Sequence, residues 1–598
     1  MGFSKRADGG SCCVIVVALF VGLFPAINPA LCGEVLHNGI ELSDPWPPDR
    51  RTLTLDSMPV PYLEHPPKVI PVDVGRQLFV DDFLIERTNC TRTFHKAKWH
   101  PASPVVVPDR KWESPPDGER GAPSAMPYSD GVWYDPADGL FKMWYFAAWG
   151  RYTCYAQSRD GIRWEKPKLD VVPGTNIVMD HTQTDLELEH TNGRDSATVW
   201  LDHAAPAGER FKMMCRDQGA GDHEIFVSAD GIHWGEPVAA TGAAQDRTSL
   251  FHNPFRGVWG LSLRSTFFRD PDRDRWHYAL TPPGGFENPG PWGAIRIRRY
   301  AEGNDLVDAA GSWPRLGKPK WWKFERGREM AMMPTVWLGA DRLDLRWRDD
   351  GAEPQLYNLD AVAYESLMVG MFAILRAVKP PDRPYGKINE LCVGFSRDGF
   401  HWDRPEREPI LGVSDDASAW NAANIQSVGG CFLVHDDKLH IYASGRGSTL
   451  DRSKYRCSTG LATIRRDGFA SMDAEADGVL TTRPLLFHGS HLFVNLDAPR
   501  GRLRVEVLDS DGNVIAPFTR EHCAGVTGDG TRLAVRWKDP VGGASDLASL
   551  AGTPVRFRFL LESGSLFAFW VANDRSGASN GYVAAGGPAF DGPRDRRQ

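Results

Sequence analysis

The stretch Ser158-Arg159-Asp160-Gly161-Ile162-Arg163-Trp164 returns as Ser228-Ala229-Asp230-Gly231-Ile232-His233-Trp234 and as Ser396-Arg397-Asp398-Gly399-Phe400-His401-Trp402. A degenerate copy follows at Arg466-Asp467-Gly468-Phe469. Ser-x-Asp-Gly predicts a tight turn, because the Asp side chain accepts hydrogen bonds from nearby backbone N–H groups and Gly adopts positive φ. We expect the following Trp to pin the next strand to the layer beneath it. A turn that recurs in this way indicates recurring β-units.

The spacing of these turns gives the number of units. Asp160 and Asp230 are 70 residues apart, and Asp398 and Asp467 are 69 residues apart. Asp230 and Asp398 are 168 residues apart, which is two such units and a surplus of 28 residues. One copy has therefore lost its turn and gained an insertion, at Thr266–Gly293. Five units of four short strands predict an all-β fold, a five-bladed β-propeller, since radial closure leaves few exposed sheet edges. A solenoid is the alternative architecture.

The length of 598 residues is too great for one compact core, so we expect two β domains. Lys5 and Arg6, the apolar run Cys12–Phe24 and the stretch Ala30-Leu31-Cys32-Gly33 predict a secretory signal, too short to span a bilayer. The expected localisation is therefore secreted or periplasmic. The predicted domains are a signal peptide (1–32), a linker or wrapping arm (33–74), the propeller (75–483), a small β-sandwich (484–575) and a disordered tail (576–598).

Charge and cysteine content narrow the range of partners. The 69 basic and 77 acidic side chains give a net charge of −8 and are spread without long runs. This balance does not indicate a nucleic-acid partner or an anionic membrane. No His-Glu-x-x-His pattern, phosphate loop or dinucleotide fingerprint occurs, so we expect neither a metal nor a cofactor. Seven cysteines beyond the signal are too scattered for a disulfide scaffold.

In a propeller the innermost strand of every blade starts at one end of the central channel, so residues at these beginnings converge. Counting back from the turns places these positions near Tyr128, Asp195, Asp246, Asp360 and either Asn424 or Gln426. Each carboxylate, taken alone, serves equally well as a strand cap or as a partner of Arg194 or Arg247. Three converging carboxylates require a ligand, a proton or a cation. We therefore predict a catalytic site that contains Asp195, Asp246 and Asp360.

A fourth catalytic candidate is Glu365, which interrupts the apolar run from Ala361 to Phe372. A carboxylate in that setting is expected to have a raised pKa, which suits a general acid. The alternative is an exposed position in a hairpin turn. Further candidates for holding a substrate are charged residues near strand beginnings and tryptophans outside the repeated boxes, whose rings stack on sugars. They are Arg194, Glu113, Glu390, Arg446, Trp149 and Trp420, with Trp276 and Trp292 in the insertion.

Three further stretches carry a resemblance to a known group of proteins. They are Leu78-Phe79-Val80-Asp81-Asp82, Asn358-Leu359-Asp360-Ala361-Val362-Ala363-Tyr364-Glu365-Ser366 and Gly386-Lys387-Ile388-Asn389-Glu390. With the Asp-Gly-x-x-Trp boxes, they resemble secreted five-bladed propellers similar to glycoside hydrolase families 32 and 43. The resemblance covers roughly Gly75 to Arg483, and the C-terminal strands resemble the sandwich that follows the propeller in family 32.

The resemblance is to the superfamily. Arg194-Asp195-Ser196 is similar to the Arg-Asp-Pro element of family 32, with Ser in place of Pro. The Trp-x-Asn-Asp-Pro-Asn-Gly stretch and the Glu-Cys pair of that family are both absent. The resemblance implies an Asp nucleophile or base, an Asp that tunes or binds, and a Glu acid, each from a different blade.

On this sequence the implied acid is Glu365, the nucleophile or base is Asp195 or Asp246, and Asp360 tunes or binds. The expected function is an exported glycoside hydrolase that acts on oligo- or polysaccharides without a cofactor. A non-catalytic carbohydrate-binding propeller is the alternative. A scaffold whose propeller face binds protein is a third interpretation.

Overall fold

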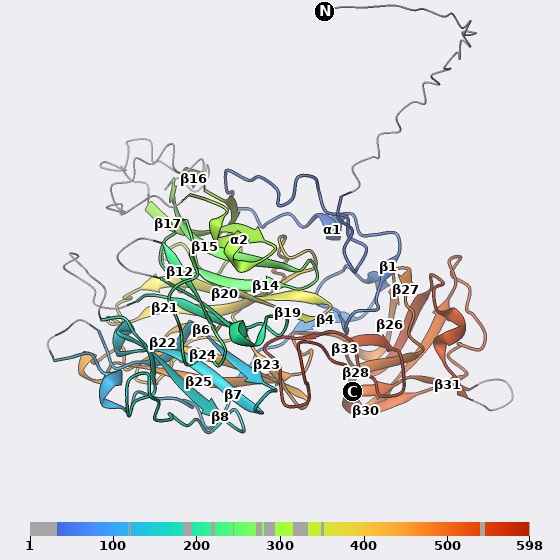
Figure 1. Ribbon diagram of the computed structural model, residues 1–598. Helices are drawn as coiled ribbons and strands as arrows, with labels where there is room; N and C mark the ends of the chain where they lie inside the picture. The colour runs from blue at the N-terminus through green and yellow to red at the C-terminus, as the bar shows by residue number, and fades with distance from the viewer. Residues whose placement is uncertain are drawn as a thin grey trace, which may run out of the picture.

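The computed structural model describes residues 33–596, except 118, 120, 183–193, 217–221, 243, 271–277, 280–292, 315–332, 349–351 and 539–543. The predicted signal peptide, Trp276 and Trp292 lie outside the described residues. Strands are the dominant secondary structure of the described residues, and they form a ring of five sheets with a second β domain beside it (Figure 1). Within the described residues, no helix combines the length and apolar character needed to cross a bilayer.

The five sheets of the ring are the blades of a propeller, in the predicted number. Blade 1 holds β6 (Ala125–Asp135), β7 (Leu140–Ala147), β8 (Tyr152–Ser158) and β9 (Ile177–Asp180); blade 2 holds β10 (Ala197–Leu201), β11 (Phe211–Arg216), β12 (His223–Ser228) and β13 (Ala239–Ala240). Blade 3 holds β14 (Ser249–Asn253), β15 (Val258–Arg269), β17 (Gly293–Gly303) and β18 (Thr335–Leu338), with β16 (Tyr278–Ala279) beside β15 and helix α2 (Leu306–Gly311) after β17. Blade 4 holds β19 (Gln355–Glu365), β20 (Leu367–Val378) and β21 (Lys387–Ser396); blade 5 holds β22 (Ala423–Gln426), β23 (Leu433–His435), β24 (Lys438–Gly447) and β25 (Arg456–Arg465).

A strand from before the first blade completes the last one. β5 (Lys98–Trp99) pairs antiparallel with β25, with Trp99 opposite Ala462. Val106 forms a further bridge to Thr459 of the same strand. The two ends of the propeller sequence are thereby joined into a closed ring, which excludes the solenoid alternative.

The recurring Asp-Gly turns have the predicted geometry and a role that the sequence did not reveal. In the first, Ser158 Oγ accepts from Gly161 N at 2.9 Å and Asp160 Oδ1 accepts from Ile162 N at 2.8 Å, and the other two turns repeat these bonds. Each turn also accepts a hydrogen bond from an aromatic side chain of the preceding blade. The bonds run from Tyr442 to Gly161 O (2.5 Å), from Trp144 to Gly231 O (2.6 Å) and from Trp337 to Phe400 O (2.8 Å). The repeated box is therefore a joint between neighbouring blades.

This joint leads to a prediction for Gly231. Gly231 has a φ of 77°, and a Cβ there would lie 2.3 Å from Cζ2 of Trp144. Alanine would require a left-handed backbone, at about 1–2 kcal/mol, and displacement of a buried tryptophan. The control is Gly257→Ala, which has a φ of 67° and nothing within 4 Å of its Cβ. We expect Gly231→Ala to lower the Tm further than Gly257→Ala does, and equal Tm values would contradict the joint.

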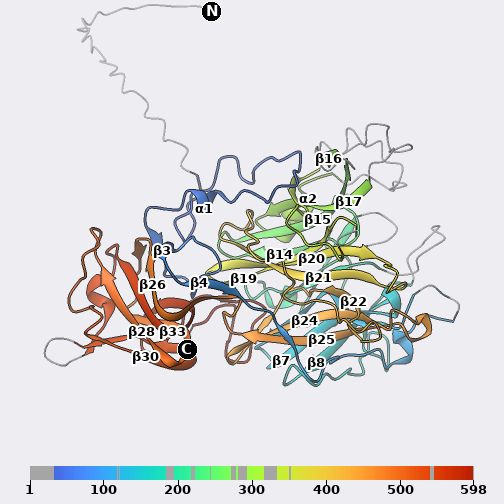
Figure 2. The same ribbon diagram turned by 180° about the vertical axis from the view of Figure 1, so that it is seen from behind.

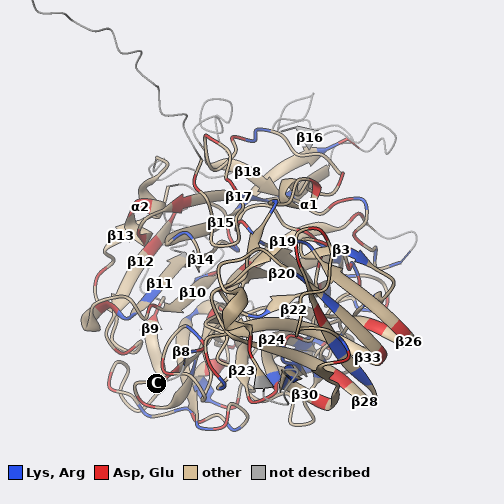
Figure 3. Ribbon diagram, turned by 90° about the vertical axis from the view of Figure 1, so that its right-hand side faces the viewer, with Lys and Arg blue, Asp and Glu red and all other residues tan. Residues whose placement is uncertain are grey.

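The second domain is built from two sheets. The larger sheet contains β3 (Ile85–Thr88), β26 (Ala470–Thr482), β33 (Arg556–Ala572), β28 (His491–Leu508) and β30 (Val526–Ala534), with β2 (Gln77–Leu78) and β4 (Thr91–Phe94) added. The smaller sheet contains β29 (Cys523–Ala524), β31 (Arg536–Lys538) and β32 (Ala544–Ser545). Val505, Trp537 and Phe569 belong to one apolar core that both sheets share, which agrees with the expected small β-sandwich. Figure 3, which is turned by 90° from Figure 1, shows both acidic and basic residues on β26, β28 and β33.

The boundary between the domains differs from the expected one. Residues 77–94 and 470–482, which the sequence places in the propeller, pair with strands of the second domain. The N-terminal arm with α1 (Pro61–Glu64) crosses from blade 3 to the second domain (Figures 1 and 2), where β1 (Ile70–Pro71) pairs with β27 (Leu485–Leu486). The arm is bound on the way, because Arg50 N donates to Thr335 Oγ1 at 2.8 Å and the Tyr62 hydroxyl donates to His401 O at 3.2 Å.

The C-terminal residues correct one expectation. Residues 576–598 were predicted to be a disordered tail, but β34 (Tyr582–Val583) pairs with the end of β19, with Val583 opposite Tyr364. Val583 and Phe590 are buried. The Gly-, Asp- and Arg-rich composition concealed a few apolar residues whose burial fixes the segment against blade 4.

Candidate active site

The beginnings of the inner strands meet around one group of side chains, here named the axial cluster. The hydroxyl groups of Tyr128, from blade 1, and Tyr357, from blade 4, lie 3.2 Å apart. Lys387 Nζ lies 3.5 Å from the Tyr357 hydroxyl. Arg247 Cζ, from blade 3, lies 3.7 Å from the centre of the Tyr128 ring. With Asp195 from blade 2 and Arg446 from blade 5, all five blades contribute. The axial cluster is Tyr128, Asp195, Arg247, Tyr357, Lys387 and Arg446.

The backbone at this end of the channel departs from regular strand geometry. Ser129, Arg247 and Asn424 have φ values of 68°, 59° and 56°. The inner strands β6, β19 and β22 each carry a register shift at the same level. Bulges redirect side chains, and strained residues of this kind concentrate at functional sites. The distorted strand beginnings therefore support a site at the axis.

Arg247 forms the floor of the axial cluster. Its guanidinium donates to Tyr128 O at 2.9 Å, and to Ser129 Oγ and Gln426 Oε1, each at 3.0 Å. The Ser129 hydroxyl in turn donates to Asp360 Oδ2 at 3.0 Å. Asp360 lies three residues beyond Tyr357, roughly 10 Å further along the channel, and is 2% exposed. Its place is beneath Arg247, where it orients Ser129.

The two tyrosines of the cluster have pKa values that are pushed apart. Burial would raise the pKa of Tyr357, but the positive charges of Lys387 and Arg247 outweigh burial and lower it from 10.0 to about 7. Burial and the neighbouring Tyr357 raise the pKa of Tyr128 well above its ordinary value. Such divergence within a pair of titratable groups is typical of acid–base sites. Of the two tyrosines, Tyr357 is therefore the one whose pKa is lowered toward neutral pH.

Asp195 and Asp246 differ in availability. The carboxylate of Asp246 forms an ion pair with Arg264. Asp195 is partly exposed, it interacts electrostatically with Tyr128 and Tyr357, and its Oδ1 has no hydrogen-bond partner among the described residues. Asp195 is thus the carboxylate that the cluster leaves available for chemistry.

Arg194 does not take the predicted substrate-binding position. Its guanidinium forms a buried ion pair with Asp130 of β6, and its Nε donates to Thr153 Oγ1 at 2.7 Å. Both side chains of the ion pair are fully buried. Arg194 is therefore a link between blades 1 and 2, and its partner Asp130 was not among the residues predicted from the sequence.

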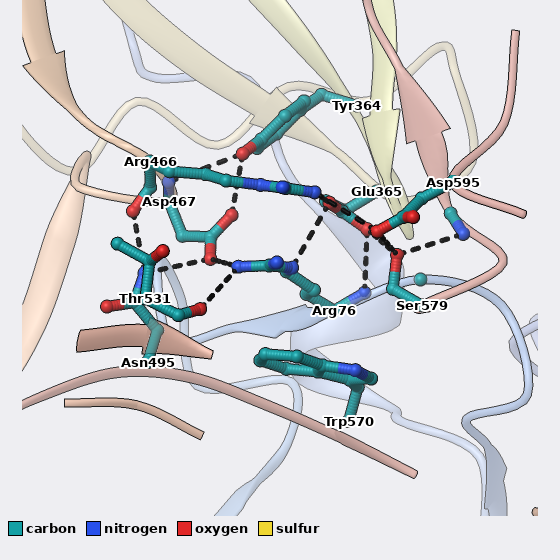
Figure 4. A network of polar contacts seen from close by, with 12 residues as sticks. Arg76, Tyr364, Glu365, Arg466, Asp467, Asn495, Thr531, Trp570, Ser579 and Asp595 are labelled. Carbon is teal, nitrogen blue, oxygen red and sulfur yellow. Dashed lines mark hydrogen bonds and ion pairs between the residues drawn. The ribbon is translucent and has the colours of Figure 1, made fainter. Parts of the chain in front are cut away.

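Glu365 lies at the other end of the propeller. It ends β19, eight residues after Tyr357, which corresponds to about 25 Å of strand. Its carboxylate lies 3.4 Å from Arg76 Nε and accepts from Arg466 Nη2 at 3.0 Å and Ser579 Oγ at 2.6 Å (Figure 4). Burial raises the pKa of Glu365, although Arg76 and Arg466 oppose this effect. The expected direction of its pKa is confirmed, but the residue joins the domains and does not reach the axial cluster.

The remaining candidates from the sequence also divide into residues at the axial cluster and residues that lie elsewhere. Trp149 borders the cluster, with its ring centre 4.9 Å from Arg446 Cζ. Glu113 accepts from two backbone N–H groups at 2.8 Å and from the Tyr145 hydroxyl at 2.6 Å, so it closes a turn. Glu390 pairs with Arg376 at 3.1 Å, in the third strand of its blade. Trp420 packs on Trp99, with ring centres 5.0 Å apart. Of these side chains, the structure brings only Arg446 and Trp149 to the axis.

Sequence reasoning missed Tyr357 and Lys387. Lys387 stands in a stretch that carries the family resemblance, and Tyr357 stands three residues before the position chosen for blade 4. The register shift in β19 falls between Leu356 and Asn358, so counting back from the turns could not reach Tyr357. A tyrosine and a lysine at the beginnings of blade-4 strands were the available signals.

A cavity of about 220 Å³ lies elsewhere, between the N-terminal arm and blades 3 and 4. Its lining includes Arg50, Trp337, Trp402 and Arg407. The residues that line it come from the arm and from two neighbouring blades, and not from the five strand beginnings that converge at the axis. No group of three or more metal-binding side chains occurs in the described part of the chain.

No protein-family model and no curated protein matches the chain, whereas solved structures do. An N-acetylgalactosamine deacetylase from F. plautii has 13% identity and a TM-score of 0.37 over 62% of this chain and 96% of its own. A thermostable family-43 glycoside hydrolase has 11% identity and a TM-score of 0.35 over 60% of this chain and 96% of its own. A fructofuranosidase from Schwanniomyces occidentalis has 12% identity and a TM-score of 0.33 over 78% of this chain and 96% of its own.

The chain is similar to these proteins in fold alone. At these identities and TM-scores, none of them carries an argument about chemistry. The candidate site therefore rests on the geometry of the axial cluster.

Proposed function

We propose that this protein is an exported glycoside hydrolase that cleaves oligo- or polysaccharides at the axial cluster. The observation that supports this proposal is the convergence of Asp195 from blade 2, Arg247 from blade 3 and Tyr357 and Lys387 from blade 4, with a titratable hydroxyl beside an available carboxylate. Export is proposed from residues 1–32 of the sequence, which lie outside the described residues.

In the proposed reaction the Tyr357 hydroxyl donates a proton to the glycosidic oxygen as the bond to the anomeric carbon breaks. Asp195 attacks the anomeric carbon or removes a proton from the attacking water. Lys387 and Arg247 stabilise the phenolate left on Tyr357, because they lower its pKa in the free protein. Tyr357 thus replaces Glu365 as the proposed acid, while Asp195 keeps its predicted role.

The direct test is a screen of the purified protein against a panel of glycosides and polysaccharides. Release of reducing ends by the wild type, and its loss in Asp195→Asn, is the expected result. Binding of a sugar without any released reducing end would instead identify a non-catalytic carbohydrate-binding propeller. No binding and no release over the whole panel would contradict both.

The pH dependence of kcat/KM provides a second test. Because the proposed acid must be protonated, kcat/KM is expected to fall as pH rises through about 7, the pKa of Tyr357. Lys387→Met removes a positive charge that lowers this pKa, so the fall should move to higher pH by roughly one unit or more. The control Arg502→Met, at an exposed arginine of the second domain, should leave the profile in place. A rate that rises through pH 7 would contradict the donor role.

A further inference from the structure

The axial cluster contains an excess of positive charge. Arg247 Cζ lies 3.7 Å from the centre of the Tyr128 ring, and Arg446 Cζ lies 5.6 Å from the same centre. On the other tyrosine, Arg296 Cζ lies 5.2 Å and Lys387 Nζ 5.4 Å from the centre of the Tyr357 ring. Four cationic side chains therefore lie around the two tyrosine rings.

These cations are held by neutral acceptors. Arg247 donates to a carbonyl, a hydroxyl and an amide oxygen. With the Asn424 amide assigned so that its oxygen faces Arg446, that oxygen accepts from Nε and Nη2 of Arg446 at 2.9 and 3.0 Å. Gln355 Oε1 accepts from Arg296 Nη1 at 3.0 Å. Within the described residues, no carboxylate forms an ion pair with Arg247, Arg296, Lys387 or Arg446. These hydrogen bonds leave Nε of Arg247 without a partner among the described residues, and they do not neutralise the charges.

Several other buried arginines are paired with carboxylates, whereas Arg298 and Arg299 of blade 3 donate to carbonyl and hydroxyl oxygens. Arg397 lies 2.7 Å from Asp81, and Arg404 forms a buried ion pair with Asp344. Burying an unpaired charge costs free energy, so such pairing is the rule in proteins. Of the nearby carboxylates, Asp246 pairs with Arg264 and Asp130 with Arg194. Asp360 lies beneath Arg247 with the Ser129 hydroxyl between them. Asp195 and Asp360 together do not balance four cations.

We propose that the axial cluster binds a sugar that carries an anionic group, a carboxylate or a sulfate. The proposal rests on the proposed function for the identity of the ligand as a sugar, and it adds the charge of that sugar. The anionic group would lie among Arg446, Lys387 and Arg296, whose charges it neutralises in a nearly buried setting where electrostatic attraction is strong. Arg247 remains bound to the floor of the cluster.

A consequence for Tyr357 gives an independent measurement. The cations that lower the pKa of Tyr357 also attract the anionic group. Binding of an anion next to Tyr357 therefore raises this pKa, and the protein takes up a proton near pH 7. Calorimetry in buffers of different ionisation enthalpy measures that proton uptake. A neutral sugar is expected to bind without it.

The test compares matched pairs of oligosaccharides. One set consists of uronic-acid oligosaccharides and the same molecules after reduction of the carboxyl group, and the other of sulfated oligosaccharides and their desulfated forms. We expect an acidic member to bind with proton uptake. We expect its neutral counterpart to bind at least about tenfold more weakly. The two sets distinguish a carboxylate from a sulfate. Equal binding within every pair, binding of neutral members alone, or binding of no member overturns the proposal.

Variants connect this binding to the residues. Lys387→Met and Arg446→Met should each weaken binding of the acidic sugar and leave binding of its neutral counterpart within about twofold, whereas Arg502→Met should change neither. Equal loss for both sugars overturns the assignment of the charged group to these residues. Because the measurement is of binding, its outcome is separate from catalysis. If acidic sugars bind but are not cleaved, only the proposed hydrolase activity is refuted. If neutral sugars are cleaved, only the proposal of an anionic ligand is refuted.

Discussion

Tyr357→Phe is expected to lower kcat/KM by roughly 100-fold or more, because a positioned general acid contributes about that much to a rate. The substitution removes one oxygen atom and retains the ring that lies beside Arg296 and Lys387. It leaves the hydroxyl of Tyr128 without the partner that now lies 3.2 Å away. Single-turnover rates on a substrate from the glycoside panel, measured with the thermal melting curve, separate loss of chemistry from loss of fold.

The matched control is Tyr442→Phe. The Tyr442 hydroxyl donates to Gly161 O at 2.5 Å, at a joint between blades and away from the axial cluster. Its removal should cost about 1 kcal/mol of stability and leave kcat/KM unchanged at temperatures where the protein is folded. If Tyr357→Phe retains wild-type kcat/KM, Tyr357 is not the proton donor, and the search for one returns to the charged residues around Asp195.

The fold was predictable where local sequence determines geometry. The Ser-x-Asp-Gly boxes specify their own turns by short-range hydrogen bonds, so their spacing counted the blades correctly. β5 and β34 were not predictable, because each is two residues long and takes its conformation from a partner strand hundreds of residues away. The degenerate box at Asp467 was recognised as a repeat, but its buried carboxylate serves the contact between the two domains.

The site was predictable to the level of the strand beginnings. Tyr128 and Asp195 were placed there by counting residues, and the structure brings both to the axis. Asp360 was placed too near the mouth because a register shift in β19 cannot be read from the sequence. The apolar neighbours of Glu365 correctly indicated burial, but they do not say at which end of the propeller the carboxylate lies. Its partner Arg76 is 289 residues away in the chain.

Arg76→Met is expected to destabilise the protein by about 3–5 kcal/mol, the usual result of removing one partner from a buried ion pair. Arg76 is 1% exposed and donates to Asp467 Oδ2 and Thr531 O, each at 2.8 Å, and its Cζ lies 4.1 Å from the centre of the Trp570 ring (Figure 4). Methionine retains contact with the ring but leaves Glu365 and Asp467 with Arg466 as their one positively charged neighbour among the residues drawn. The contact between propeller and sandwich then contains uncompensated buried charge.

The pH dependence of this loss identifies its cause. Burial would raise the pKa of Asp467, but Arg76 and Arg466 outweigh burial and lower it. In the wild type this lowered pKa contributes stability that is lost as pH falls below the ordinary carboxylate range, about 4. Without Arg76, protonation instead relieves the buried charge, so the difference in Tm between the two proteins should be largest at pH 7 and shrink toward pH 4. Arg502→Met, which breaks an ion pair with Glu562 whose side chains are 48% and 44% exposed, should cost no more than about 1 kcal/mol. If Arg76→Met and Arg502→Met have the same Tm at pH 7, the buried network does not hold the two domains together.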